Sequence, residues 1–425
     1  MEIIKYPTQS DWKNILKRPA INNNTLEETV LKVMQDVKLN GEDAIKKYTL
    51  QFDKVTITEL LVSEKEFDEA EKKISAELKS AIAIAKNNIE KFHSSQIEEA
   101  KVIETSNGVK CWRKSVAIQK VGLYIPGGTA PLFSTILMLG IPANIAGCKE
   151  IILCTPPNAK GEINEAILYT AKLLGIKKVF KIGGVQAIAA MAYGTDTIPQ
   201  VYKLFGPGNQ YVTCAKQLAS KQGVAIDMPA GPSELAILAD DSCIPKYVAA
   251  DLLSQAEHGE DSQVILVSDN LPVINEIILE LYTQLELLPR KTIAQKALLN
   301  SKAILVKNNK EGVNLLNEYA PEHLIIAVNN YETLANEIVN AGSVFLGNYS
   351  CESAGDYTSG TNHTLPTNGY AKAYSGVSLD SFVKKITFQH IDKQGLQQIG
   401  PAIEIMADTE GLQAHKNAVT IRINN

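Results

Sequence analysis

Four of the six histidines in this chain stand beside carboxylates, amides or turn residues, and none of the four has apolar neighbours on both sides. Imidazole exchanges protons near neutral pH and is a common metal ligand, so these four are the first candidates for chemistry. They are His258, His323, His363 and His415. For the remaining two histidines, at the end of an amphipathic helix and in the C-terminal tail, we expect surface positions: His93 and His390.

Gln255 and His258 are three residues apart at the end of a helix predicted over 246–258, so their side chains point to one face. Together with Asp356 and His415 they offer two imidazoles, one carboxylate and one amide oxygen. Zinc accepts such a set, and a position left open for substrate would make the site catalytic. The alternative for Gln255 and His258 is a solvated helix end, with the histidine near the negative end of the helix dipole.

Glu322 and His323 stand at the beginning of a strand predicted over 324–328. Neighbouring side chains on an extended segment point to opposite faces, so the two groups need not touch. A histidine near neutrality is matched to removing a proton from an alcohol, and the carboxylate would position water or a second group. The alternative is a strand-edge pair exposed to water.

The stretch from residue 342 to 366 is rich in Ser, Gly, Asn and Thr and lacks helical or strand periodicity over most of its length. Loops of this length inside a compact domain are uncommon and are often functional. Asp356 and His363 lie in it. We therefore expect a functional loop here.

Three glycine-rich turns each follow a predicted strand and precede a predicted helix, which is where ligands of open α/β sheets tend to bind. Glycine allows backbone N–H groups to approach a phosphate closely. The turns are Tyr124 to Gly128, Gly183 to Ala187 and Phe205 to Asn209. None has the G-x-G-x-x-G pattern with an acidic residue about 20 positions later, so each by itself is also compatible with a simple chain reversal.

The elements that would position these residues form an N-terminal helical layer and two α/β series. Apolar residues at three- and four-residue spacing predict helices over 24–95. Short β-rich runs alternate with helix-length segments, which predicts parallel sheets covered on both faces, with a boundary near 230–240. The runs are 116–126, 150–155, 178–182, 202–205, 223–228 and 234–239, then 263–268, 302–306, 324–328 and 343–346. From about 379 onward the sequence predicts a helical tail that needs a core elsewhere.

Composition excludes several classes of protein. The net charge is −5 and the 42 basic residues are scattered, so we expect neither a nucleic-acid nor a membrane partner. The most apolar run, 131–145, is shorter than the roughly 20 residues that span a bilayer and predicts a buried helix. The first residues lack the pattern of a secretory or transit signal, so we expect a cytoplasmic location.

Taken together, the motifs resemble the histidinol dehydrogenase family over almost the whole chain, to residue 423. They are Gly122 to Gly128, Phe205 to Asn209, Met228 to Glu234, Leu253 to Gly259, Pro321 to Leu324, Glu352 to Tyr357, Gly360 to His363 and Ala414 to Val419. One position departs from the pattern, since Cys351 stands where proline is common in the family. We expect this thiol to be a bystander; the alternative is that it makes the loop sensitive to oxidation.

The resemblance implies an α/β fold of two incomplete Rossmann-like parallel-sheet domains, with an N-terminal helical layer and a small helical C-terminal tail. It implies a homodimer that exchanges terminal pieces, so that active sites are shared between subunits. The expected division is an N-terminal segment, a discontinuous first domain, a second domain and a dimerisation tail: 1–23, 24–122 with 235–378, 123–234, and 379–425.

The resemblance also implies roles for individual residues. The zinc ligands would be Gln255, His258, Asp356 and His415, the last supplied by the other subunit. Acid–base chemistry would fall to Glu322 and His323. Besides the zinc ligands and His323, contacts to substrate would come from Ser233, His363 and Glu410. Contacts to NAD would come from Tyr124, Gln186 and Asn209.

The implied activity is the zinc-dependent oxidation of L-histidinol, through bound histidinal, to L-histidine with two NAD, at the end of histidine biosynthesis. A zinc-dependent hydrolase is the chief alternative, because the same residues around zinc could activate water. A sensor protein that binds NAD or metal without turnover is the second alternative. The Glu322-His323 pair disfavours it, because a sensor needs no base.

Overall fold

The computed structural model of the chain describes residues 1–19, 23–127 and 131–424. Gly128, in the first predicted glycine turn, lies outside these ranges, and so do residues 20–22 of the predicted N-terminal segment. Among the described residues, no helix combines the length and the apolar character needed to cross a bilayer.

One core of the molecule is a six-stranded sheet in which all strands run parallel. Its strands, in spatial order, are β1 (Glu2–Lys5), β11 (Lys302–Leu305), β10 (Gln263–Ser268), β9 (Glu234–Ala239), β12 (His323–Ala327) and β13 (Ser343–Leu346). Every residue of the central strands β9, β10 and β12 is buried, which explains their nearly continuous apolar sequences. Strand β1 was missed by the sequence analysis, which treated residues 1–23 as a separate segment.

The second core is a five-stranded parallel sheet. Its strands, in spatial order, are β6 (Lys178–Lys181), β5 (Glu150–Thr155), β4 (Lys120–Tyr124), β7 (Lys203–Phe205) and β8 (Ala225–Ile226). In the five-stranded sheet, the strand order runs from β4 to one side and then reverses, so a topological switch point lies between β4 and β7. In the six-stranded sheet, β9, β10 and β11 run to one side and β12 and β13 to the other, so its switch point lies between β9 and β12, and β1 joins at the edge beside β11.

Helices cover both faces of each sheet. On the six-stranded sheet, side chains at alternate positions of β9 pack into two separate apolar clusters. One face carries α9 (Pro245–Ala256), α10 (Leu271–Leu285) and α11 (Lys291–Leu299), and the other carries α1 (Gln9–Ile15), α12 (Asn309–Tyr319) and α13 (Tyr331–Ala335). The five-stranded sheet is covered in the same way by α5 (Ser134–Ala146) and α6 (Glu165–Leu173) on one face, and by α7 (Gly184–Tyr193) and α8 (Gln210–Lys221) on the other.

The N-terminal helical layer packs on the five-stranded sheet. It consists of α2 (Asn23–Tyr48) with a π-helical turn (Thr49–Asp53), α3 (Glu64–Lys73) and α4 (Ala76–Ser94). Helix α2 contacts α7 and α8, whereas α3 contacts α6 and α4 contacts α5. The predicted grouping of 24–122 with 235–378 differs from this packing, because the apolar faces of these helices complete the two clusters around the five-stranded sheet.

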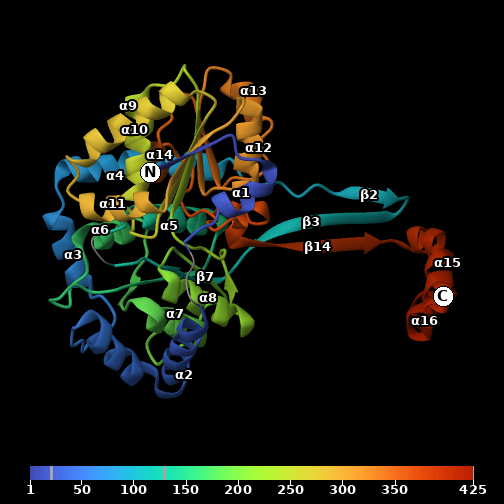
Figure 1. Ribbon diagram of the computed structural model, residues 1–425. Coiled ribbons are helices and arrows are strands. Elements are labelled where there is room, and N and C mark those ends of the chain that lie inside the picture. Colours follow the sequence, from blue (N-terminus) through green and yellow to red (C-terminus); the bar gives the residue numbers. More distant parts are fainter. Residues whose placement is uncertain (20–22, 128–130, 425) are drawn as a thin grey trace.

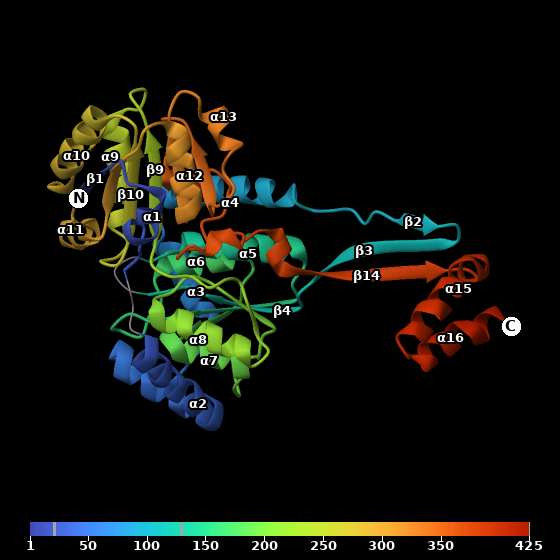
Figure 2. The ribbon, with the colours of Figure 1, turned by 45° about the vertical axis from the view of Figure 1, so that its right-hand side comes forward.

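An antiparallel arm of three strands projects from the body and ends in two helices (Figures 1 and 2). The arm consists of β2 (Ile103–Ser106), β3 (Val109–Ala117) and β14 (Val383–Ile391), and the helices are α15 (Lys393–Thr409) and α16 (Gln413–Ile423). The prediction of a helical tail from 379 is therefore wrong for 383–391, which pairs with β3 along its whole length. Phe388 stacks on Trp112 of β3 with ring centroids 5.5 Å apart, a cross-strand contact between distant segments.

Candidate active site

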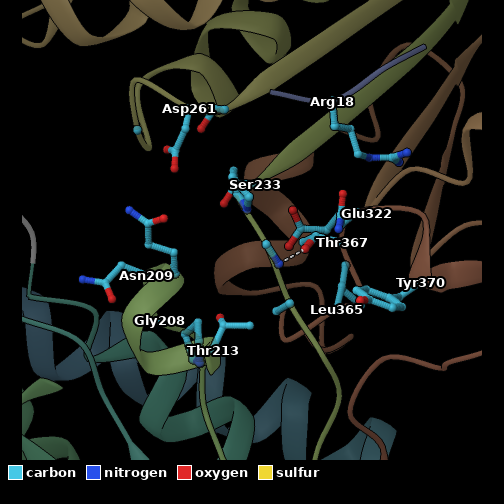
Figure 3. A pocket seen from close by; sticks show the side chains of 18 of the residues that line it. Arg18, Gly208, Asn209, Thr213, Ser233, Asp261, Glu322, Leu365, Thr367 and Tyr370 are labelled. Carbon is cyan, nitrogen blue, oxygen red and sulfur yellow. Dashed lines mark hydrogen bonds between the residues drawn. The ribbon is translucent and has the colours of Figure 1, made fainter. Parts of the chain in front are cut away.

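A cavity of about 1000 Å³ opens where the two sheets meet. From the five-stranded sheet it is lined by the turns that follow β4 and β7, including Gly127 and Asn209. From the six-stranded sheet it is lined by residues at the amino ends of β9 and β12, including Ser233 and Glu322. Figure 3 shows Asn209 and Thr213 on one side of this space and Glu322 and Thr367 on another. One sheet thus presents its carboxyl edge and the other its amino edge.

His323 is the centre of the polar cluster at this edge. It is the first residue of β12 and is buried. Its Nδ1 lies 3.8 Å from Glu322 Oε2 and 3.9 Å from Glu352 Oε1, and its Nε2 lies 3.5 Å from Asp356 Oδ1. Three carboxylates therefore surround one imidazole. Among the described residues, Nδ1 makes no hydrogen bond.

Glu322 is close to His323 because it precedes the strand and is held from the neighbouring one. Helix α12 ends at Ala320 in the left-handed region (φ +53°), and Pro321 then turns the chain toward β12. The Glu322 carboxylate accepts a hydrogen bond of 2.9 Å from the backbone N–H of Glu234, at the start of β9. The alternation of side chains along a strand did not predict this approach, because Glu322 lies outside the regular strand.

Glu352 was not assigned a role by the sequence analysis. It and Asp356 lie on a short helix, α14 (Glu352–Tyr357), within the stretch predicted to be an irregular loop. Their spacing of four residues places both carboxylates on one face of the helix. Glu352 is buried and accepts a hydrogen bond of 2.8 Å from Ser254 Oγ on α9. The four-residue spacing from Asp356 was the signal in the sequence that could have found it.

His258, Glu352 and Asp356 each offer one ligand atom, and these atoms lie within 4.8 Å of one another. The Gln255 side chain reaches the same place from α9. When its amide is assigned from the surrounding donors and acceptors, its nitrogen faces Glu352 and its oxygen lies 3.0 Å from the Glu234 N–H. A mixed set of imidazole nitrogen and carboxylate oxygen suits zinc. The cluster thus contains two predicted zinc ligands, His258 and Asp356, with the third, Gln255, beside it.

Burial and charge set the proton affinities in the cluster. Burial raises the pKa of Glu322 to about 8, although the attraction of His323 opposes the shift. Burial lowers the pKa of His323, but the surrounding carboxylates, with Glu322 first, outweigh it and raise this pKa to about 10. Loss of hydration lowers the pKa of His258, although part of its side chain stays exposed, and burial lowers the pKa of His363. Burial and the neighbouring charges therefore act in opposite directions on the pKa of Glu322 and on that of His323.

His363 and Ser233, which the sequence analysis expected to contact substrate, both line the cavity. The His363 ring is held at both nitrogens: Nδ1 lies 2.8 Å from the backbone oxygen of Asp356, and Nε2 lies 3.0 Å from Thr135 Oγ1 on α5. Ser233 immediately precedes β9. Both positions border the carboxylate cluster.

The three residues expected to contact NAD lie at the carboxyl edge of the five-stranded sheet. Asn209 lines the cavity and caps α8 by accepting hydrogen bonds from Tyr211 and Val212. Tyr124 and Gln186 are buried behind it and are not among the residues that line this cavity. The Tyr124 hydroxyl accepts a hydrogen bond of 3.1 Å from the Gly184 N–H at the start of α7.

Glu410 and His415 are not brought to the cavity by a single chain. Both are exposed, Glu410 at the end of α15 and His415 on α16, beyond the tip of the arm (Figure 2). A role for either residue at this site therefore requires a second copy of the chain.

His93 is buried, so the prediction of a surface position for it is wrong. Its Nδ1 lies 2.8 Å from the Ile89 carbonyl oxygen and its Nε2 lies 3.3 Å from Asn362 Nδ2. Asn362 is adjacent to His363, so this histidine helps to anchor the loop that carries a cavity residue. Cys351 is exposed and immediately precedes α14.

The fold and the site define an α/β enzyme with two parallel sheets, in which a buried glutamate–histidine pair adjoins a cluster of side chains that could hold a metal ion. A family model for histidinol dehydrogenase matches residues 16–423. The chain belongs to the histidinol dehydrogenase family.

Individual relatives agree over the full length. A histidinol dehydrogenase of Bacteroides fragilis is 61% identical over 423 residues, covering 100% of this chain and 99% of the relative. The histidinol dehydrogenase of Escherichia coli strain K12 is 48% identical over 420 residues, covering 98% and 96%. The histidinol dehydrogenase from Elizabethkingia anophelis, for which there is a crystal structure, is 56% identical in sequence. The two structures superimpose with a TM-score of 0.98 over 100% of this chain and 98% of the other.

Proposed function

We propose that this protein oxidises L-histidinol through bound histidinal to L-histidine, with zinc and two NAD per histidine. The observation that carries the proposal is the Glu322-His323 pair, buried at the wall of the cavity and adjacent to the cluster of His258, Glu352 and Asp356. Membership of the family supports the dehydrogenase reading over a hydrolase or a sensor.

The residues present fit the two cofactors. Zinc would be held by Gln255, His258, Asp356 and a His415 from another subunit, and NAD would lie along the turns at the carboxyl edge of the five-stranded sheet, near Tyr124, Gln186 and Asn209. When bound, zinc supplies a template for the substrate nitrogens and NAD supplies the hydride acceptor. The orphaned Oε1 of Gln186, buried without a hydrogen-bond partner among the described residues, fits a polar ligand at this edge.

Proton transfer falls to the chain itself. His323, whose Nδ1 is unpartnered in the described part of the chain, takes the hydroxyl proton of the alcohol when its ring is neutral. A zinc ion held by Asp356 would offset the carboxylate charge that raises the pKa of His323, and so would favour the neutral imidazole that a base requires. His323 releases this proton to solvent, and ionised Glu322 activates the water that adds to the aldehyde. His323, neutral again, acts as base in the second oxidation. The Glu234 N–H donates to Glu322 Oε2 and so orients this carboxylate. Ser233, His363 and Glu410 complete the substrate pocket, and a closed site retains the reactive aldehyde.

A homodimer with shared active sites is part of this proposal. The arm carries Glu410 and His415 away from the body of its own chain, which supports delivery of both to a partner. Apolar side chains on the arm and tail are exposed in the single chain, among them Phe388, Ile405 and Met406. A second copy would cover them, since exposed apolar patches of this kind mark interaction sites. A cytoplasmic location stays a prediction.

The test is formation of NADH by the purified, zinc-loaded protein supplied with L-histidinol. The proposal expects NADH to form, to stop after chelation of the metal and to resume when zinc is returned. Absence of NADH from a fully zinc-loaded protein would favour the hydrolase, whereas binding of NAD without turnover would favour the sensor.

A further inference from the structure

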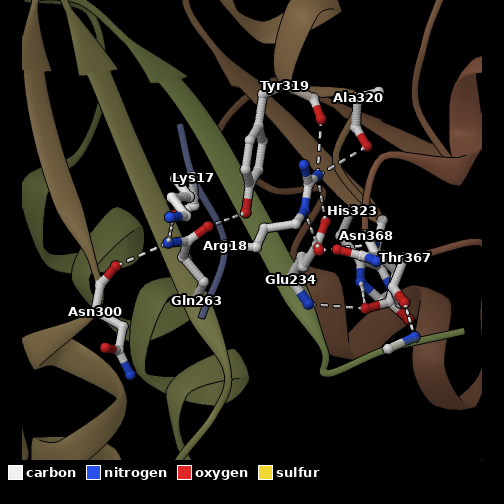
Figure 4. A network of polar contacts seen from close by, with 12 residues as sticks. Lys17, Arg18, Glu234, Gln263, Asn300, Tyr319, Ala320, His323, Thr367 and Asn368 are labelled. Atoms are coloured by element: carbon white, nitrogen blue, oxygen red, sulfur yellow. Dashed lines mark hydrogen bonds and ion pairs between the residues drawn. The ribbon is translucent and has the colours of Figure 1, made fainter. Parts of the chain in front are cut away.

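Arg18 lies on the N-terminal segment, well before the catalytic pair in sequence, yet its guanidinium group reaches the wall of the cavity. We propose that Arg18, acting through Glu234, is a positioning residue that fixes the geometry of Glu322 and His323. This inference rests on the proposed function, because it concerns how well that reaction is catalysed. Figure 4 shows the network of contacts on which it depends.

The first contact is a two-pronged ion pair with Glu234. Arg18 Nε donates to Glu234 Oε1 at 2.5 Å, and Nη2 donates to Oε2 at 2.8 Å. The Glu234 side chain is 3% exposed and that of Arg18 is 18% exposed, so the pair lies largely out of water. A planar guanidinium matches both oxygens of a carboxylate at once, which a lysine ammonium does not.

The second contact leads from Glu234 to the catalytic carboxylate. The backbone N–H of Glu234 donates to Glu322 Oε2 at 2.9 Å. The Glu234 side chain also accepts a hydrogen bond of 2.7 Å from the backbone N–H of Asn368, which lies in a loop that lines the cavity. Glu234 therefore contacts Arg18, Glu322 and the loop. If its side chain shifted, its backbone N–H, which orients Glu322, would shift as well.

The third contact holds the peptide that leads into the catalytic pair. Arg18 Nη2 donates to the carbonyl oxygen of Tyr319 at 2.7 Å and faces that of Ala320 at 3.4 Å. The guanidinium carbon also lies 4.1 Å from the centroid of the Tyr319 ring, a cation–π contact. Ala320 has a left-handed backbone (φ +53°), which costs energy for a residue with a side chain and persists only where its surroundings hold it. Glu322 follows two residues later.

Arg18 thus fixes both the backbone that carries Glu322 and the N–H group that orients its carboxylate. Displacement of a catalytic group by about 1 Å is enough to lower turnover by about 100-fold. Because Arg18 itself is not placed at the reacting atoms, its loss should lower kcat more than it raises the KM for histidinol.

The experiment compares Arg18→Ala, Arg18→Lys and Glu234→Gln with the wild-type enzyme. For each, kcat and the KM for histidinol are measured together with zinc content and the circular dichroism spectrum. Lys172→Ala is the matched control, because Lys172 makes its ion pairs with Asp68 and Glu71 on the exposed surface. The activity of Arg18→Ala is then measured with added ethylguanidinium, and with ethylammonium at the same concentration.

We expect kcat to fall about 10- to 100-fold in all three variants with KM changed less than about threefold, full zinc content and unchanged spectra. Ethylguanidinium should restore part of the kcat of Arg18→Ala, and ethylammonium should not. Glu234→Gln and Arg18→Lys keep the test decisive if Arg18→Ala does not fold. Wild-type kcat in any folded variant, or equal effects of the two additives, would overturn the inference. Failure of the wild-type enzyme to oxidise histidinol would instead overturn the proposed function.

Discussion

Replacement of Lys216 by methionine tests whether a buried ion pair holds the glycine turn that follows β7, at the carboxyl edge of the five-stranded sheet where NAD is proposed to bind. The Lys216 and Asp227 side chains are 4% and 1% exposed, with Nζ 2.5 Å from Oδ1. Nζ also donates to the Gly206 carbonyl oxygen at 2.8 Å, and Asp227 accepts from the Gly206 N–H at 2.8 Å. The pair therefore holds Gly206 from both sides.

Methionine keeps much of the side-chain volume but removes the direct ion-pair partner of the buried Asp227 carboxylate. Breaking a buried ion pair in this way costs about 3–5 kcal/mol. We expect Lys216→Met to lower the free energy of unfolding by that amount, measured by urea denaturation. Because the turn that ends at Asn209 loses its anchor, we also expect the KM for NAD to rise about tenfold.

Two controls separate the buried charge from other effects. The double variant Lys216→Met with Asp227→Asn removes both charges and should recover part of the lost stability, since no lone charge stays buried. Lys172→Met removes two exposed ion pairs and should cost less than about 1 kcal/mol. A Lys216→Met protein within about 1 kcal/mol of wild type would refute the reasoning.

Four further predictions concern the catalytic site, the dimer and a buried carboxylate. His323→Ala should fold and bind zinc but lose nearly all turnover, and wild-type kcat in this variant would show that His323 is not the base. His258→Ala should lose its metal by elemental analysis; full zinc occupancy would remove His258 from the ligands. If the active sites are shared, His323→Ala and His415→Ala proteins that are mixed and refolded together should regain about one quarter of wild-type activity. About half of the dimers then contain one subunit of each variant, and one of the two sites in such a dimer is intact. No recovery of activity would argue against shared sites. Burial raises the pKa of Asp53 from its ordinary value of 3.8 to about 6, so the ionised carboxylate destabilises the folded state by an amount that grows between pH 3.8 and pH 6 and is constant above. The gain in Tm of Asp53→Asn should therefore rise over this pH range and then level off. A gain that does not change from pH 4.5 to 8 would contradict the prediction.

Much of the framework could be predicted from local pattern alone. Buried parallel strands have continuous apolar sequences, so strands such as 150–155, 234–239 and 263–268 were predicted with the bounds that the structure has. The helix that carries Gln255 could be predicted from its apolar pattern and from the glycine that follows His258. The three-residue spacing of Gln255 and His258 indicated that both side chains point to one face, where His258 joins the carboxylate cluster. These features depend on residues close together in the chain.

The features that were missed depend on distant segments. Strand β14 forms only because β3, over 250 residues earlier, offers an unpaired edge. His93 is buried because Asn362 and α5 cover it, which helical periodicity near residue 93 does not reveal. Glu352 was overlooked because a short helix interrupts a stretch whose composition is typical of a loop. The resemblance to a family gave Glu410 and His415 their expected roles, and their positions on the arm explain why a single chain does not show them at the site.

The central claim is that one site carries out both oxidations of histidinol. The most direct measurement counts NADH and histidine formed by the purified, zinc-loaded enzyme from a limiting amount of L-histidinol. We expect two NADH for each histidine, with no free histidinal accumulating. One NADH per histidinol with release of the aldehyde, or no NADH at all, would contradict the account.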